Sequence, residues 1–183
     1  MKTVHFAIFI HSHQPVGNFD HVFHQSCDRC YQPLLETLAS YPEIRLTMHF
    51  SGSLLEWIEA NRPEISDYVA EMVRRGQIEL MGGGYYEPIL TMLTEQDRQG
   101  QLCSFSAHLR RRYNARVRGA WLTERVWEQS LVSSLADAGI EYTALDDSHF
   151  HSAGIPDSAL TGSFITEDQG NTIRVFPGSE RLR

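Results

Sequence analysis

Two kinds of apolar pattern alternate along the chain. Short apolar runs rich in β-branched and aromatic side chains predict strands that are buried on both faces. These runs lie at residues 4–10, 44–50, 78–82, 119–123, 142–146 and 163–167. Apolar residues at three- and four-residue spacing predict helices at residues 31–41, 53–60, 63–76, 95–113 and 130–139. Strands and helices in alternation predict βα units around a mostly parallel sheet, which is an α/β fold.

Residues at the helix ends support these boundaries. Pro63 stands in the predicted first turn of one helix, and Gly76 follows the last turn of the same helix. Gly139 closes the helix that begins at residue 130. Glycine is favoured there because it readily adopts the left-handed backbone that ends a helix.

The chain is expected to form a single domain over residues 1–183, because it holds no repeat, low-complexity segment or linker. About five or six βα units are visible, fewer than a closed βα barrel requires. No helical pattern follows the last strand-like run, residues 165–177. We therefore expect a domain that is truncated at its C-terminal end.

Composition and charge exclude several classes of protein. The net charge of −7 argues against a nucleic-acid-binding protein, which would carry a basic surface. The apolar run at residues 4–10 is shorter than the roughly 20 residues of a membrane-spanning helix, and no signal-peptide cleavage site follows it. Three cysteines are too few for a disulfide scaffold. We expect a cytoplasmic protein without membrane or nucleic-acid partners.

Polar and titratable side chains follow five of the predicted strands. In βα folds the chemistry lies at the carboxyl ends of the strands and in the loops that follow them. The side chains at these ends include His11, His13, His49, Glu87, Glu124, Arg125, Asp146, Asp147 and His149, and the third predicted strand carries Glu79 within it. Their recurrence at successive strand ends predicts an active site.

The segment WLTERVWE points to carbohydrate chemistry. Trp121 and Trp127 stand on either side of Glu124 and Arg125. Sugar sites combine aromatic rings, which stack on the CH faces of a glycan, with carboxylates that bind its hydroxyls or react at its anomeric carbon. A neighbouring arginine favours the ionised form of a carboxylate. The alternative interpretation is a buried Glu–Arg pair that supports the loop.

Three motifs in order resemble those of the family 57 glycoside hydrolases, a family of 4-α-glucanotransferases, α-amylases, amylopullulanases and branching enzymes. The first motif is HQP at residues 13–15. The second is GQIEL at residues 76–80, which continues into residues 82–88. The third is WLTERVWE at residues 121–128. The form MGGGYYEPIL is most similar to the 4-α-glucanotransferase and α-amylase branch.

The resemblance implies a fold, a reaction and a set of site residues. The fold is an incomplete (β/α)7 barrel, of which this chain would be the N-terminal part. The reaction acts on α-1,4-glucans or maltooligosaccharides with retention of anomeric configuration, as hydrolysis or as glucan transfer, and without a cofactor or metal. Glu124 corresponds to the nucleophile. His13, Glu79 and Trp121 correspond to residues of the donor-sugar site. His11 is expected at the same site because it lies two residues before His13, at the end of the first predicted strand.

The sequence departs from the family pattern in two places. The acid/base aspartate of the family lies well downstream of the nucleophile, and no counterpart precedes Arg183. The carboxylates that remain available, none of them in a matching motif, are Asp146, Asp147, Asp157, Glu167 and Asp168. We therefore expect residues 1–183 alone to be inactive and to depend on a missing C-terminal portion or on self-association. The second departure is Gln129, where the family often has proline.

Two other interpretations stay open. His11 and His13 at the end of the first strand also resemble the metal ligands of amidohydrolase-type barrels, with His49, His149 and Asp147 as further candidates. The other interpretation is a non-catalytic fragment that binds glucan.

A weaker motif is Cys27-x-x-Cys30, which we interpret as a reduced pair rather than a metal site, because no second pair accompanies it.

Overall fold

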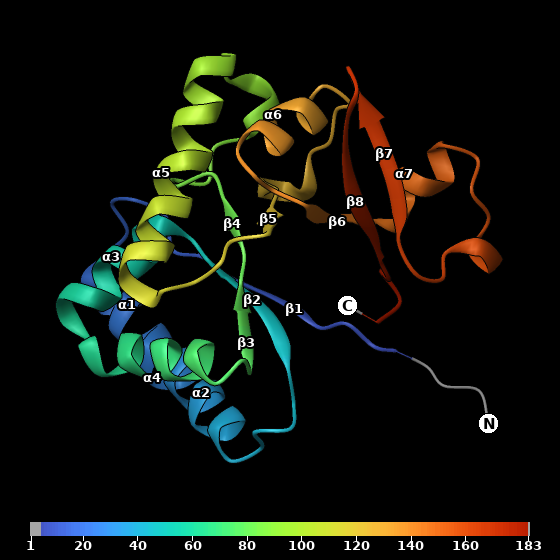
Figure 1. The fold of residues 1–183 in the computed structure, drawn as a ribbon. Coiled ribbons are helices and arrows are strands. Elements are labelled where there is room, and N and C mark those ends of the chain that lie inside the picture. Colours follow the sequence, from blue (N-terminus) through green and yellow to red (C-terminus); the bar gives the residue numbers. More distant parts are fainter. Residues whose placement is uncertain (1–4, 183) are drawn as a thin grey trace, which may run out of the picture. The chain divides into compact units, whose positions relative to one another are not determined.

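The computed structural model describes residues 5–182, which form two compact units (Figure 1). The first unit contains the residues up to Met81 together with Ala107–Arg116, and the second contains Gly82–Ser106 together with the residues from Val117 onward. The α/β class predicted from the sequence is confirmed. The expectation of a single domain stays a prediction.

The first unit is built on a parallel sheet in the order β1-β2-β3. Its strands are β1 (Phe9–Ser12), β2 (Leu46–Phe50) and β3 (Ile78–Leu80). Its helices are α1 (Asp20–Ser26), a π-helical segment (Cys27–Tyr31), α2 (Gln32–Ala39), α3 (Gly52–Asn61) and α4 (Pro63–Arg74). Helix α4 packs against α2, α3 and β3 (Figure 1).

Helix α4 shows how the sequence pattern produces this packing. Ile65, Val69 and Met72 recur at helical spacing, and each is at most 1% exposed. Pro63 lies in the first turn, as predicted, because the N–H that proline lacks has no partner there in any helix. Gly76 has a φ of +72°, the left-handed backbone that was expected after the helix end.

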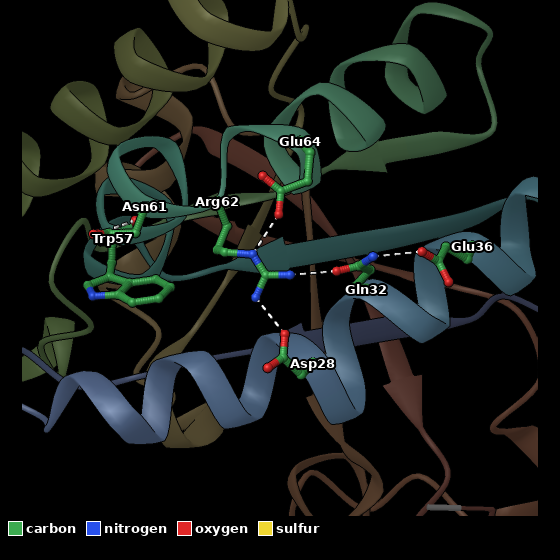
Figure 2. Close-up of polar contacts among 7 residues, drawn as sticks. All are labelled: Asp28, Gln32, Glu36, Trp57, Asn61, Arg62 and Glu64. Atoms are coloured by element: carbon green, nitrogen blue, oxygen red, sulfur yellow. Dashed lines mark hydrogen bonds and ion pairs between the residues drawn. The ribbon is translucent and has the colours of Figure 1, made fainter.

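Arg62 lies at the junction of α3 and α4 and binds to side chains of the π-helical segment and of α2 (Figure 2). Its guanidinium donates hydrogen bonds to Asp28 at 2.6 Å, to Gln32 at 2.6 Å and to Glu64 at 2.5 Å. Gln32 in turn donates to Glu36, one turn further along α2. Because the acceptors come from the π-helical segment, α2 and α4, one side chain fixes the relative positions of three helical segments.

The second unit is built on a five-stranded sheet in the order β4-β5-β6-β8-β7, parallel except for the antiparallel pair β7 and β8. Its strands are β4 (Gly82–Gly83), β5 (Gly119–Trp121), β6 (Tyr142–Asp146), β7 (Phe164–Asp168) and β8 (Asn171–Gly178). Its helical segments are α6 (Leu131–Asp137), α7 (Asp147–Ser152) and the 3-10 turns Leu90–Met92, Thr123–Arg125 and Asp157–Ala159. Helix α5 (Glu95–Tyr113) begins in this unit and ends in the first.

Hydrophobic side chains from α5, α6 and the central strands form the core of the second unit. Leu102, Ala120, Leu131, Val132 and Leu135 are completely buried. Trp127 packs against this cluster. Of the two tryptophans around Glu124, Trp127 therefore contributes to the core.

Most predicted elements are present, with shifts at their ends. Helix α5 and strand β6 have the bounds that the pattern predicts. The first strand was predicted at residues 4–10, but β1 begins at Phe9 and runs to Ser12, and residue 4 lies outside the described residues. The segment after β6 was expected to be a loop, but it forms α7. No helix within residues 5–182 combines the length and the apolar character that a bilayer crossing requires.

Candidate active site

Histidines from β1 and β2 form a stacked group in the first unit. His11 and His49 are register partners on these parallel strands, and their Nδ1 atoms lie 2.9 Å apart. The two rings stack with centroids 5.0 Å apart, and the ring of His13 stacks on His11 at 6.1 Å. An Nδ1–Nδ1 hydrogen bond needs one donor and one acceptor, so at least one of the two imidazoles lacks a proton at Nδ1.

His49 is completely buried, and this environment favours its neutral form. Burial lowers the pKa of His49 well below the usual range, and the nearby His11 and His13 lower it further. A neutral His49 that bonds to Nδ1 of His11 fixes the orientation of the His11 ring. The sequence had placed His49 at a strand end without assigning it to the sugar site.

Glu79 lies on the same face of the three-stranded sheet as His11 and His49. It is the register partner of Thr47, which precedes His49 by two positions on β2. Alternate residues of a strand point to the same face, and register partners on neighbouring strands share that face. The first unit therefore gathers His11, Glu79 and the stacked His13, three of the five predicted site residues.

The other two predicted residues, Trp121 and Glu124, lie in the second unit at the end of β5. Trp121 is half-buried at the last position of the strand, and Glu124 is exposed in the turn that follows. Glu124 has a φ of 53° and Arg125 a φ of 55°. Two consecutive non-glycine residues with left-handed backbone cost about 1–3 kcal/mol each and persist only where the surroundings hold them.

Three segments of the second unit hold this turn. Arg125 donates from Nε to Oδ2 of Asp146, at the end of β6, over 2.8 Å. Nε2 of His149, in α7, donates to the backbone carbonyl of Arg125 over 3.1 Å. Thr123 donates from Oγ1 to Oε2 of Glu87, in the loop after β4, over 3.0 Å. The turn is therefore rigid, and the Glu124 side chain is presented to solvent from a fixed backbone.

Arg125 has partners that the sequence did not predict. The carboxylate with which it forms an ion pair is Asp146, and both side chains are about four-fifths buried, with 18% and 21% exposed. The guanidinium carbon also lies 5.8 Å from the ring centroid of Trp121, within cation–π range. The loop-supporting ion pair is therefore Arg125–Asp146, which connects residues on two strand ends.

Glu87 is a titratable residue of the second unit that was noted at a strand end but not assigned to the site. Burial raises the pKa of Glu87 to about 7, the hydrogen bond from Thr123 opposes this rise, and the negative charge of Glu124 adds to it. A signal was present in the sequence, since Glu87 lies within the second family-like motif at the end of a strand.

The other four carboxylates considered as acid/base candidates have structural partners. Asp147 accepts from the backbone N–H of Glu180, Asp157 pairs with His151, Glu167 accepts from the backbone of Gly170, and Asp168 accepts from Ser133. Gln129, where the family often has proline, donates to Thr166 at 2.7 Å and to the carbonyl of Glu167 at 2.6 Å. This departure from the family pattern therefore anchors β7 beside α6.

The cysteine pair is free of a disulfide. Cys27 is buried and Cys30 is exposed on the π-helical segment. Burial raises the pKa of Cys27 to about 11, so the thiol is protonated at neutral pH. The thiol of Cys27 is therefore a poor nucleophile.

Comparisons with known proteins agree on one family. The model of Glycosyl hydrolase family 57 matches residues 7–183. The chain is 45% identical over its whole length to a 4-alpha-glucanotransferase of Thermococcus litoralis and to an alpha-amylase of Pyrococcus horikoshii. It spans only 28% and 29% of these two relatives.

A solved structure supports the same family assignment. The crystal structure of the 4-alpha-glucanotransferase from Thermococcus litoralis superposes with a TM-score of 0.94 at 45% identity, over 97% of this chain and 28% of that one. The family 57 enzymes among the solved neighbours have a (β/α)7 barrel, and this chain corresponds to a part of that barrel. The predicted fold is therefore confirmed.

Proposed function

The chain belongs to glycosyl hydrolase family 57, and we propose that the protein containing it acts on α-1,4-glucans with Glu124 as its nucleophile. The observation that carries the proposal is the geometry of Glu124. An exposed carboxylate stands on a left-handed turn shortly after a strand end, and three other segments hold that turn.

The proposed reaction retains anomeric configuration. The Glu124 carboxylate attacks the anomeric carbon of the donor sugar and forms a covalent glycosyl ester, while an acid protonates the departing glycosidic oxygen. The same acid, now a base, then removes a proton from the incoming hydroxyl group that cleaves the ester. A rigid turn suits this role because the attacking oxygen must stay within a short distance of one carbon atom.

The donor sugar is bound, in this proposal, by His11, His13, Glu79 and Trp121. Imidazoles and a carboxylate offer hydrogen-bond donors and acceptors for hydroxyl groups, and the indole offers a stacking surface for the CH face of the ring. The acid/base aspartate lies outside residues 1–183, which is consistent with the small share of the relatives that the chain spans.

Hydrolysis and glucan transfer remain alternatives for the second step. Water as the incoming hydroxyl gives hydrolysis, and the terminal hydroxyl of another glucan gives transfer. The two relatives bear the names of both activities. Product analysis on maltotriose separates the two, because only transfer produces chains longer than the substrate.

The test of the proposal is Glu124→Gln in the full-length protein. The amide cannot attack the anomeric carbon, so turnover of maltooligosaccharides should fall by about 10,000-fold or more, with thermal unfolding unchanged. A 2-fluoro glycosyl fluoride should label the wild-type protein at Glu124, seen by peptide mass spectrometry, and should leave the variant unlabelled. Wild-type turnover by Glu124→Gln would refute the assignment.

The isolated chain provides a second test. Residues 1–183 alone should show no turnover, because an unprotonated sugar alkoxide is a poor leaving group and the chain supplies no matching acid. Disproportionation of maltooligosaccharides by residues 1–183, lost in Glu124→Gln, would show that the acid/base lies within this chain.

The cytoplasmic location expected from the sequence stays a prediction.

Two alternatives predict different results. A metal-dependent hydrolase using His11 and His13 would lose activity on chelation and regain it with added zinc. A non-catalytic glucan-binding protein would bind maltooligosaccharides without turnover even at full length. The proposed enzyme should keep its activity in a chelator.

A further inference from the structure

The loop after β4 presents Glu87 in one fixed orientation. The backbone N–H of Glu87 donates to the carbonyl of Gly84 over 3.2 Å, and Glu87 has a left-handed φ of 56°. A Cβ atom at Gly84 would lie 2.6 Å from Cδ of Pro88, so only glycine allows this tight turn. The backbone N–H of Tyr86 donates to Gln101 of α5, which anchors the loop.

The Glu87 side chain reaches the turn that carries Glu124. Its Oε2 accepts the hydroxyl proton of Thr123 over 3.0 Å, and Thr123 immediately precedes Glu124 in the chain. Arg125 and His149 hold the turn on its C-terminal side, after Glu124. The Thr123–Glu87 hydrogen bond holds it on the N-terminal side.

The role of Glu87 in the turn depends on the hydrogen bond that it accepts from Thr123. Its carboxyl is largely buried, and the charge of a second carboxyl, Glu124, acts on it. A neutral glutamine would accept the same hydrogen bond without repelling Glu124. Glutamine at this position should therefore preserve the placement of Thr123, whereas an apolar side chain such as leucine should not.

We propose that Glu87 is a positioning residue, which acts through Thr123 to hold the left-handed turn of Glu124 in the orientation that attack requires. The proposal rests on the proposed role of Glu124 as nucleophile. Neither Glu87 nor Thr123 touches the reacting atoms in this scheme. Loss of their hydrogen bond lets the turn relax, so that Glu124 less often points at the anomeric carbon.

The experiment compares isosteric variants in the full-length protein. Thr123→Val removes the hydroxyl at almost constant shape, and Thr123→Ser keeps it. We expect Thr123→Val to lower kcat about 10- to 100-fold with less than about a 3-fold change in KM, since misplacement of a reacting group affects the chemical step. Thr123→Ser should restore kcat to within about 3-fold of wild type, because the hydrogen bond to Glu87 is kept.

A control and a second pair of variants complete the test. Thr161→Val makes the same substitution at an exposed threonine outside the turn and should leave kcat and KM unchanged. If Thr123→Val does not fold, substitutions of the hydrogen-bond acceptor, Glu87, test the proposal instead. Glu87→Gln keeps the acceptor and should retain kcat within about 10-fold, and Glu87→Leu should lower it about 100-fold.

The outcomes separate this proposal from the one on which it rests. Wild-type kcat in folded Thr123→Val, or in Glu87→Leu, overturns the positioning role, even where Glu124→Gln is inactive. A parallel loss in kcat and melting temperature that Thr123→Ser does not rescue also overturns it, because it shows a purely structural role. Full activity of Glu124→Gln would instead overturn the proposed function.

Discussion

Nε of Arg125 lies 2.8 Å from Oδ2 of Asp146, so the residue after the proposed nucleophile is bound to the end of the neighbouring strand β6. About four-fifths of each side chain is removed from solvent. The guanidinium also covers the ring of Trp121. The conformation of the turn therefore depends on a contact between residues that are far apart in the sequence.

Removing one partner of this ion pair should destabilise the protein. Arg125→Met leaves the Asp146 carboxylate mostly buried without its cation, and we expect a loss of about 1–3 kcal/mol in the free energy of unfolding. Asp146→Asn should cost less, because the amide oxygen still accepts from Arg125. Urea denaturation of both single variants and the double variant measures the coupling. Strictly additive effects would show that the pair contributes nothing to stability.

Gly119 should tolerate no side chain. A Cβ atom at this position would lie 2.3 Å from Cζ of Tyr142, a ring held within the sheet. Gly119→Ala should therefore destabilise the protein by about 1–3 kcal/mol.

Gly100→Ala is the matched control, because nothing lies within 4 Å of its added Cβ in helix α5. Alanine favours helix, so this variant should gain about 0.5–1 kcal/mol. The melting temperatures should move in opposite directions. A neutral Gly119→Ala would mean that the Tyr142 ring moves aside freely.

The first unit should lose stability in acid through Glu59. Burial raises the pKa of Glu59, but hydrogen bonds from His108 and Tyr113 outweigh it, so the pKa lies below its usual value. A carboxyl with a lower pKa in the folded state binds protons more readily when unfolded. Its contribution is therefore full above the unfolded pKa of about 4.3 and is lost as pH falls through the folded pKa.

The measurement compares wild type with Glu59→Gln by urea denaturation between pH 3 and pH 7. We expect wild type to be the more stable above about pH 5 and the difference to shrink below about pH 4. A difference independent of pH would contradict the role of the Glu59 charge.

The two cysteines of the CxxC motif should differ in reactivity. Cys27 is buried with its pKa raised to about 11, so almost no thiolate forms at neutral pH, whereas Cys30 is exposed. Iodoacetamide at pH 7.5 should alkylate Cys30 at least about 10-fold faster than Cys27 in the folded protein. Denaturation in urea should remove the difference, which peptide mass spectrometry can follow. Equal rates in the folded state would contradict the burial of Cys27.

Elements whose patterns are local could be predicted from the sequence alone. Helix α5 has the predicted bounds although its surroundings were unknown, because its apolar spacing persists over 19 residues. Gly76 and Gly139 have the left-handed backbone expected at helix ends, since only the local chain geometry requires it. The WLTER motif likewise placed Glu124 directly after a strand.

Some elements were not predicted because their apolar patterns are weak or short. Residues 20–31 contain few apolar side chains, yet Phe23, Cys27 and Tyr31 recur every four residues and are buried. That spacing was a usable signal for α1 and the π-helical segment. Helix α7 has only six residues, too few for a periodic pattern to identify it.

Which side chains act together depends on how the separate elements pack. The partners of Arg125 and Thr123 are Asp146 and Glu87, at sequence separations of 21 and 36 residues. The burial that raises the pKa of Glu87 depends on packing around the loop, which no spacing along the chain encodes. Periodicity reports the face that a residue presents within its own element. Contacts, burial and the resulting electrostatics depend on how separate elements pack, and these properties fix the conformation of the turn that carries Glu124.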